Sequence, residues 1–230
     1  MRITRGCAWE GACATHTRPE YNPAVRQRTI FEIAIVYTLI QAALWTRGHM
    51  QMFWVAMAVI CLGVMTARGG RSAAALGLRR NVREGSARIL AAGFVTAIAI
   101  LFAGWAAGTL HAPQGRHSPV LGFVIYSVFA LGQEFVLQSF FFVRLESAFA
   151  SGRGAVVAAA LLFCMAHLPN AVLVIATFLG ALFFCEAFRR YRNLYPIWLA
   201  HLMLGLAVAA AVPDSLTHQM KVGAAYLTYR

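Results

Sequence analysis

Residues 118–143 read SPVLGFVIYSVFALGQEFVLQSFFFV, an apolar run with a single carboxylate, Glu134, deep inside it. A helix that crosses a bilayer needs about 20 mostly apolar residues, which this run provides. At 1.5 Å per residue, Glu134 would lie roughly 15 Å from the interface. An ionised acid at that depth costs about 2.5–3.5 kcal/mol and usually faces the bundle interior with a function. The alternative is a neutral glutamic acid that makes a structural hydrogen bond between helices.

The rest of the chain has the same apolar character. Of its 230 residues, 60% are hydrophobic and 12% are charged, and the mean hydropathy is +0.65. Soluble domains carry about 25% charged residues, so this chain needs lipid as its solvent. These properties predict an all-α, polytopic transmembrane helix bundle of about seven spans. The expected spans are residues 30–46, 49–67, 89–109, 118–143, 154–169, 171–188 and 194–213.

The positive charge is distributed unevenly over the loops. Sixteen of the 20 Lys and Arg residues lie in residues 1–29, 68–88, 144–153 and 189–193, which are alternate connections of a seven-span chain. Basic residues accumulate on the cytoplasmic side of membrane proteins, so the pattern predicts an N-in, C-out orientation. The net charge of +12 could instead indicate nucleic-acid binding. The position of the basic residues between apolar segments favours topology, and we expect no nucleic-acid partner.

The same pattern divides the chain into six parts. We expect a polar cytoplasmic arm, two front helices, an Arg-rich cytoplasmic linker, a third helix with an outer loop, a catalytic-like core and a C-terminal tail. Their bounds are 1–29, 30–67, 68–88, 89–117, 118–213 and 214–230. The cysteines form no CxxC pair, so we expect no metal and no cofactor.

Other polar side chains are expected near Glu134. Gln138 is four residues further on and shares its helix face, while Gln133 is about 100° round the helix. Of the seven histidines, only His167 and His201 lie in apolar segments. A lone buried histidine is usually structural, but two histidines and one glutamate on three helices together indicate a site.

Most intramembrane protease chemistries lack their residues in this chain. There is no HExxH motif, Asp214 is the only aspartate, and no GxSx-like nucleophile motif lies near a histidine. Cys164, three residues before His167, is a weak candidate nucleophile because thiols in apolar surroundings react poorly. General acid–base hydrolysis remains. A glutamate and a histidine could activate a water, and a second histidine could donate to the oxyanion.

These motifs resemble those of the CAAX-prenyl endopeptidase and bacteriocin-processing (CPBP, or Abi) family of membrane glutamic proteases. Phe163 and His167, followed by Leu-Pro-Asn170, match the second family motif intact. His201 follows Leu-Tyr-Pro-Ile as in the third motif, but Gly205 replaces its Asn or Asp. The first motif, Glu-Glu-x-x-x-Arg, departs most. Its positions are occupied by Gln133, Glu134 and Gln138.

The resemblance implies a metal-independent intramembrane endopeptidase in the lipid bilayer, acting on a membrane-anchored protein or peptide. In the family the first glutamate is the base and the second pairs with the arginine. With that arginine absent, the hypothesis is that Glu134 takes the base role. His167 and His201 would be catalytic with it, and Gln133, Gln138, Phe163 and Asn170 would support them. A bacterial cytoplasmic membrane is the expected location, and the oligomeric state stays open.

Two alternatives remain open. One is a catalytically inactive relative that acts as a membrane scaffold or immunity protein. The other is a small proton-coupled transporter, because intramembrane Glu and His can relay protons. The sequence shows no inverted repeat of the kind that such carriers have.

Overall fold

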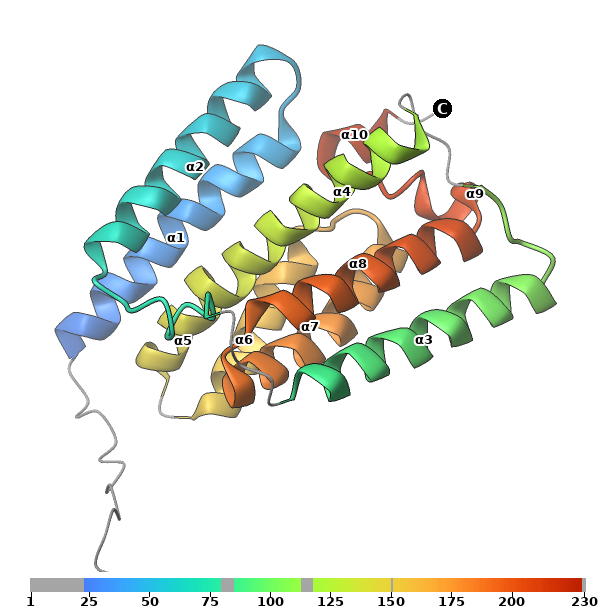
Figure 1. The fold of residues 1–230 in the computed structure, drawn as a ribbon. Helices are drawn as coiled ribbons and strands as arrows, with labels where there is room; N and C mark the ends of the chain where they lie inside the picture. Colours follow the sequence, from blue (N-terminus) through green and yellow to red (C-terminus); the bar gives the residue numbers. More distant parts are fainter. Residues whose placement is uncertain (1–22, 80–84, 113–117, 150, 229–230) are drawn as a thin grey trace, which may run out of the picture.

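Helices form the whole framework of the computed structural model, which describes residues 23–79, 85–112, 118–149 and 151–228 (Figure 1). Lipid offers no hydrogen bonds, so apolar segments must satisfy their backbone groups internally, as helices do. The helices are α1 (Pro23–Trp45), α2 (His49–Arg68), α3 (Ser86–Ala106), α4 (Pro119–Glu134), the π-helix η1 (Phe135–Phe142), α5 (Val143–Ala148), α6 (Gly152–Met165), α7 (Ala171–Tyr191), α8 (Leu194–Ala211), α9 (Asp214–Thr217) and α10 (Gly223–Leu227).

Six of these segments are long and apolar enough to cross a membrane: α1, α2, α3, the continuous α4–η1–α5 unit, α7 and α8. Each of the seven predicted segments overlaps one of the helices, and the protein is an all-α, multi-pass membrane protein. The exception in length is α6, whose 14 residues span only about 21 Å. The prediction of a span over 154–169 was too long at its end, because the helix stops at Met165 and His167 lies in the following turn.

Helices α3 and α8 pack along each other in the same direction. Gly93 lies against Ala200 and Gly104 against Ala211, so the residue numbers increase together. A Cβ on either glycine would come within 2.8 Å of the facing alanine Cβ or closer. Small residues allow this close approach between membrane helices. Between α3 and α8 the chain runs through α4, α6 and α7, and each of these helices reverses its direction. Because α3 and α8 are parallel, α6 must be one of these passes through the bundle although it is short.

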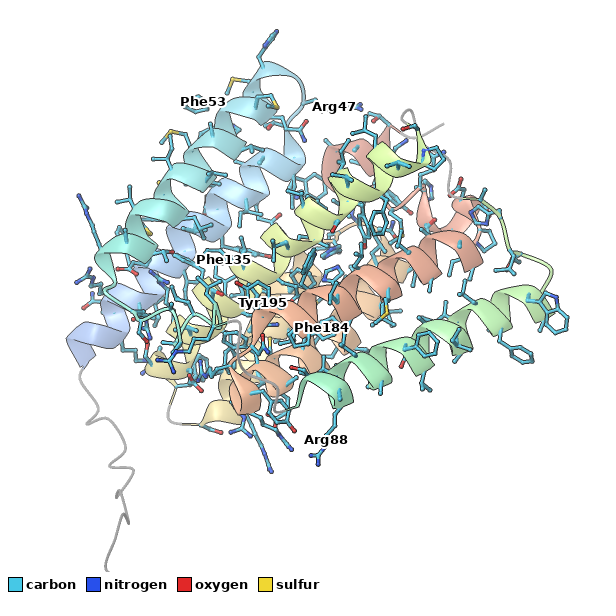
Figure 2. All side chains as sticks on the ribbon, in the orientation of Figure 1. Arg47, Phe53, Arg88, Phe135, Phe184 and Tyr195 are labelled. Carbon is cyan, nitrogen blue, oxygen red and sulfur yellow. The ribbon has the colours of Figure 1, made fainter. Side chains whose placement is uncertain are left out.

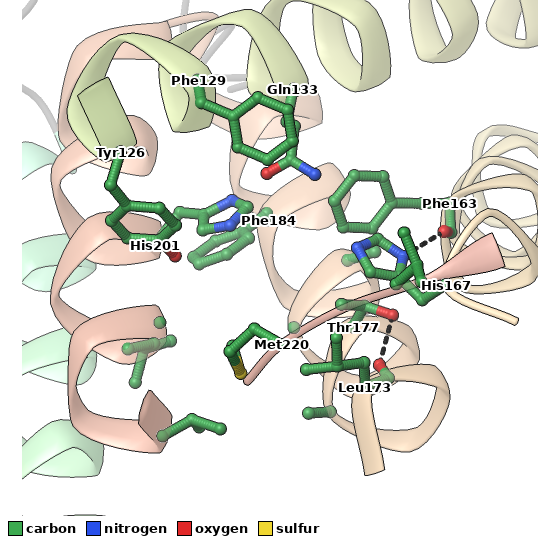
Figure 3. Close-up of a pocket in the computed structure, with 17 residues that line it drawn as sticks. Tyr126, Phe129, Gln133, Phe163, His167, Leu173, Thr177, Phe184, His201 and Met220 are labelled. Atoms are coloured by element: carbon green, nitrogen blue, oxygen red, sulfur yellow. Dashed lines mark hydrogen bonds between the residues drawn. The ribbon is translucent and has the colours of Figure 1, made fainter. Parts of the chain in front are cut away.

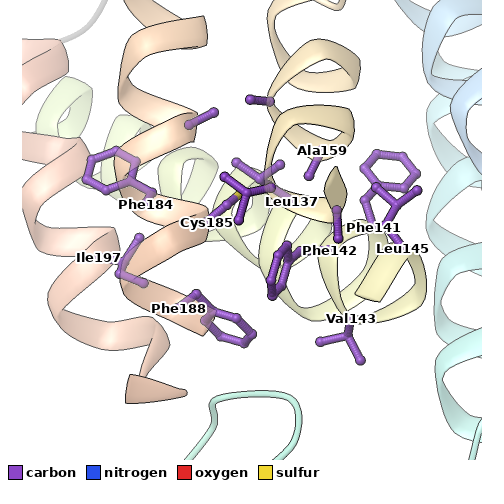
Figure 4. Close-up of a cluster of buried hydrophobic side chains, with 14 of the residues drawn as sticks. Leu137, Phe141, Phe142, Val143, Leu145, Ala159, Phe184, Cys185, Phe188 and Ile197 are labelled. Carbon is purple, nitrogen blue, oxygen red and sulfur yellow. The ribbon is translucent and has the colours of Figure 1, made fainter. Parts of the chain in front are cut away.

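The fourth predicted segment is longer and less regular than expected. It is a continuous helical unit from Pro119 to Ala148, with Ser118 capping its start and η1 in the middle. The side chains of η1 form the centre of the protein, since Phe140 and Phe142 are fully buried. Phe142 meets Phe188 of α7 edge to face at 6.0 Å between ring centroids (Figure 4).

The arginine-rich connections come together at one end of the bundle. Arg71 of the linker donates to Ser147 Oγ near the end of α5, and Leu194 N donates to Gly77 O. Figure 2 shows Arg88 at this end and Arg47, from a connection with little charge, at the opposite end. This grouping agrees with the prediction that alternate connections lie at the same end of the bundle. The orientation of the bundle in the membrane, with the N-terminus on the cytoplasmic side, stays a prediction.

The front pair of helices, α1 and α2, is tied to this end by a buried arginine. Arg144 of α5 is only 3% exposed, and its Nε lies 2.9 Å from Glu32 Oε2 on α1. Its Nη2 donates to Met65 O on α2 at 2.9 Å, and its guanidinium covers the Phe140 ring. The sequence predicts Glu32 only as an interfacial partner of Arg28, a pair that is also present.

Two chain ends differ from the expected parts. Helix α1 begins at Pro23, inside the predicted arm, and residues 1–22 of that arm lie outside the described residues. In the predicted tail, residues 214–228 include α9 and α10 and pack against the core. Gly223 N donates to Leu168 O at 2.8 Å. Gly223 has φ +56°, and a Cβ there would collide with Leu44 O, so only glycine fits.

Candidate functional site

Glu134 lies at the junction of α4 and η1 with no exposed surface. Its Oε1 is 2.6 Å from Nδ1 of His201 on α8, and its Oε2 accepts a hydrogen bond from Gln138 Nε2 at 3.1 Å. An ionised carboxylate can only accept, so Nδ1 of His201 then carries the proton. Both carboxylate oxygens are therefore engaged, and the carboxylate orients the imidazole.

Neighbouring side chains hold the imidazole ring of His201 in place. Its ring stacks on Phe184 of α7 at 6.0 Å with an interplanar angle of 11°, and Phe163 of α6 meets it edge-on at 6.2 Å. One turn earlier on α8, Trp198 Nε1 donates to Ser127 O of α4 at 2.8 Å, which fixes α8 against α4. With Nδ1 bound to Glu134, the other ring nitrogen, Nε2, is the one available for a proton transfer.

His167 approaches the same place from the turn after α6. Its Nδ1 lies 2.8 Å from Phe163 O, an atom that can only accept, so Nδ1 carries the proton and Nε2 is the acceptor in the neutral ring (Figure 3). The Phe163 ring meets the His167 ring edge-on at 4.9 Å and also contacts His201. Phe163 thus joins the two histidines.

Both histidines line one cavity of about 170 Å³ between α4, α6, α7 and α8 (Figure 3). Its wall is mostly apolar, and its polar groups come from Tyr126, Gln133, Thr177 and the two histidines. Met220 and Val222 of the C-terminal segment complete the wall. A largely apolar cavity with a few converging polar groups is the usual form of a binding or active site.

The neighbouring residues Gln133 and Glu134 face different surroundings. Gln133 lines the cavity, whereas the buried Glu134 does not. We expected both Gln133 and Gln138 to orient Glu134, but only Gln138 contacts it through a hydrogen bond. Glu134 can therefore act on the cavity only through His201, and Gln133 and Tyr126 are the polar residues that α4 presents there.

Asn170 has a structural position beside the site. It is fully buried, and its Oδ1 accepts from Leu173 N as the cap of α7. Its Nδ2 donates to Thr217 O at 2.7 Å and to Lys221 O at 3.0 Å. Asn170 therefore fastens the C-terminal segment next to the cavity, and its amide is fully used in doing so.

Sequence reasoning missed most of the cavity wall, including Tyr126, Phe129 and Phe184. Tyr126 and Phe129 are at helical spacing before Gln133, so the face of α4 could have been recognised from the periodicity. Phe184 had no local signal among the many phenylalanines. Gly205, one turn after His201, lies directly against the Tyr126 hydroxyl, with which a Cβ at this position would collide.

The geometry combines a carboxylate–imidazole pair with a second imidazole and an amide in an apolar cavity. Such a set can hold a water, take its proton and donate to a developing negative charge. Within the described parts of the chain, no three His, Cys, Asp or Glu side chains gather as a metal-ion site.

Comparison with known proteins gave a match to a family and none to an individual protein. Searches of curated proteins and of solved structures gave no match. A family model does match, over residues 115–207, from the start of α4 to beyond His201 on α8. That family is described as type II CAAX prenyl endopeptidase, Rce1-like, and is a protease family, so the resemblance predicted from the motifs is confirmed for the segment that carries Glu134, His167 and His201.

Proposed function

We propose that this protein is an intramembrane endopeptidase that hydrolyses a membrane-associated polypeptide in the cavity between α4, α6, α7 and α8. The observation that carries the proposal is the Glu134–His201 pair, with Nδ1 2.6 Å from Oε1 and the imidazole on the cavity wall. The family match over residues 115–207 supports the reaction class. The substrate would be a membrane-anchored protein or peptide, and a bacterial cytoplasmic membrane is the proposed location.

In this proposal, His201 contacts the water and Glu134 acts through His201. Nε2 of His201 takes a proton from the water, and the resulting hydroxide attacks the peptide carbonyl carbon. Glu134 stabilises the imidazolium that forms, as the carboxylate of a carboxylate–histidine pair does. The tetrahedral intermediate then breaks its C–N bond, and His201 returns the proton to the leaving nitrogen.

The other polar groups have complementary roles in the same step. Neutral His167 presents an acceptor at Nε2, so it would hold the water instead of donating to the oxyanion. The side-chain amide of Gln133 is a donor on the cavity wall and would bond the developing oxyanion, as Gln side chains can. This assignment replaces the expectation that the second histidine donates.

The test uses purified protein in proteoliposomes with a panel of peptides that carry an apolar anchor. We expect wild type to cleave at least one peptide, and His201→Gln to lower its kcat by about 10²-fold or more. The matched control is His111→Gln, because His111 lies outside the cavity lining. Cleavage by His201→Gln at the wild-type rate would contradict the proposal.

A second candidate, a binding protein without catalysis, is favoured by one observation. Glu134 has no exposed surface, and the cavity-lining neighbour, Gln133, has no ionisable group. Such a protein would bind the anchored peptide without cutting it. Gln133→Glu separates the two candidates, since it adds a carboxylate to the cavity wall. Cleavage by this variant alone, with none by wild type, would support the binding protein.

A further inference from the structure

A second pocket, of about 410 Å³, lies at the arginine-rich end of the bundle, away from the site described above. Three segments that are distant in sequence form it: the linker after α2, helix α5 and the turn between α7 and α8. Its lining residues are Arg71, Ala74, Ala75, Arg79, Val143, Glu146 and Arg192. Three arginines and one glutamate give the pocket an excess of positive charge.

One of the three arginines is already neutralised and fixed in place. Arg192 forms an ion pair with Glu146, the only acid of the pocket wall. Its guanidinium also lies over the rings of Phe142 and Phe188, with 5.7 and 5.3 Å to the centroids. Stacking on aromatic faces restricts a guanidinium. Arg192 therefore forms a rigid wall of the pocket.

Neither of the other two arginines forms an ion pair among the described residues, and Arg71 shares the field of Glu146 with Arg192. Arg71 is only partly exposed, and its hydrogen bond to the neutral Ser147 Oγ is long, at 3.4 Å. Burial and the nearby charges of Arg144 and Arg192 lower the pKa of Arg71 below its usual range. A partly buried cation among other cations is unfavourable unless an anion compensates it.

Three arginines at this end outside the pocket are paired with acids. Arg144 is bound to Glu32, and Arg189 and Arg190 share Glu186 at 2.7 and 2.6 Å. Arg71 and Arg79 form no such ion pair, and they line the same pocket. A single anion can bridge them, and the guanidinium geometry suits two oxygens of a phosphate.

We infer that this pocket binds a phosphate group, held by Arg71 and Arg79 against the wall formed by Arg192. The position at the end of the helices, with Ala74, Ala75 and Val143 as apolar neighbours, suits an anionic lipid headgroup. A soluble phosphate offers the same chemistry, so the two sources are separated by experiment. The inference does not depend on the proteolytic activity proposed above.

The experiment measures binding to the purified full-length protein in neutral detergent. Retention of phosphatidylglycerol and of phosphatidylcholine is compared by native mass spectrometry. In a second arm, the melting temperature is measured in sodium phosphate and in sodium chloride of equal ionic strength. Arg71→Gln with Arg79→Gln is compared with Arg88→Gln with Arg153→Gln, which removes the same charge from exposed positions outside the pocket.

We expect wild type to bind phosphatidylglycerol in preference to phosphatidylcholine, and the pocket variant to bind it about tenfold more weakly. The control variant should stay within about twofold of wild type. Stabilisation by sodium phosphate that the pocket variant loses, without lipid binding, would also support the pocket and identify a soluble source. Equal losses in both variants, or no loss in either, would overturn the inference.

A folding defect in the double variant would not leave the question open. Arg79 is exposed, so Arg79→Gln alone removes a phosphate ligand with little effect on packing. Its melting temperature without ligand should equal that of wild type, and its phosphatidylglycerol affinity should fall about threefold. Unchanged affinity in this single variant would then overturn the inference.

Discussion

Glu32 and Glu134 are two of the acidic residues in the apolar helices that bind basic partners, and their partners differ in kind. Glu32, 17% exposed, binds the guanidinium groups of Arg28 and Arg144, which stay charged at any physiological pH. Glu134, with no exposed surface, binds the imidazole of His201 and the neutral amide of Gln138. The first centre joins helices permanently. The second contains a group that can take up and release a proton, which is what acid–base chemistry needs.

The largest expected difference between the centres is in activity. Glu134→Gln keeps the shape of the side chain but removes the charge that stabilises the His201 imidazolium. We expect kcat for peptide cleavage to fall by about 10²–10⁴-fold, with melting close to wild type. Glu32→Gln is the matched change at the other centre and should lower the melting temperature while the activity per folded molecule is unchanged. The reverse pattern would show that the two centres have been assigned the wrong roles.

The next effect concerns the buried arginine that ties the front helices to the core. Arg144→Met removes the ion pair with Glu32 and the hydrogen bond to Met65 O. We expect a loss of about 2–3 kcal/mol in unfolding free energy, below that of a fully buried pair because Glu32 is partly exposed. Arg28→Ala, which removes the exposed partner of the same carboxylate, should lose under about 0.5 kcal/mol. Chemical denaturation in mild detergent measures both, and equal losses would contradict the distinction.

A smaller effect is expected where the C-terminal segment is fastened beside the cavity. Asn170→Ala removes the cap of α7 and the two bonds to Thr217 O and Lys221 O. We expect a loss of about 1–2 kcal/mol and faster proteolysis of residues after Ala211. Asn193→Ala removes the corresponding cap of α8 without a contact to this segment, and serves as the control. Equal protection of the segment in Asn170→Ala and wild type would argue against the fastening role.

The smallest change tests the packing that positions the Glu134–His201 pair. Gly205→Ala places a methyl group against the Tyr126 hydroxyl and should push α4 and α8 apart, at a cost of about 1 kcal/mol. Activity should fall with it, while the Glu32–Arg144 centre is unaffected. Gly122→Ala on the same α4 helix meets no atom within 4 Å and should change neither stability nor activity. Crosslinking between cysteines placed on α4 and α8 would measure the displacement.

Much of this framework could be predicted from the sequence because each part of it has a local signal. Apolar length predicted the seven helices, and arginine counts predicted which connections share an end of the bundle. The depth of Glu134 and the isolation of His167 and His201 in apolar segments singled them out. These signals are one-dimensional: they give the position of a residue along a helix.

The parts that could not be predicted depend on contacts between helices. The sequence places Gln133 and Glu134 on different faces of one helix, but which of the two faces the cavity depends on how α4 packs against α8. The partnership of Glu32 with Arg144 spans more than a hundred residues, and Arg28 was the nearer candidate. The burial of Asn170 and the path of the C-terminal segment likewise depend on distant backbone atoms.

The π-helix has a consequence for how this segment can vary between related chains. A turn closed by i→i+5 bonds holds about one residue more than an α-turn. Helix η1 lies between Glu134 and Arg144. Its extra residues therefore set the angle around the helix axis between these two side chains. Deleting one residue from Phe135–Phe142 would let a wide turn close into an α-turn, which leaves the residues after it facing nearly the same way. Adding a residue to this stretch has no such compensation, and it would turn Arg144 by about 100° away from Glu32.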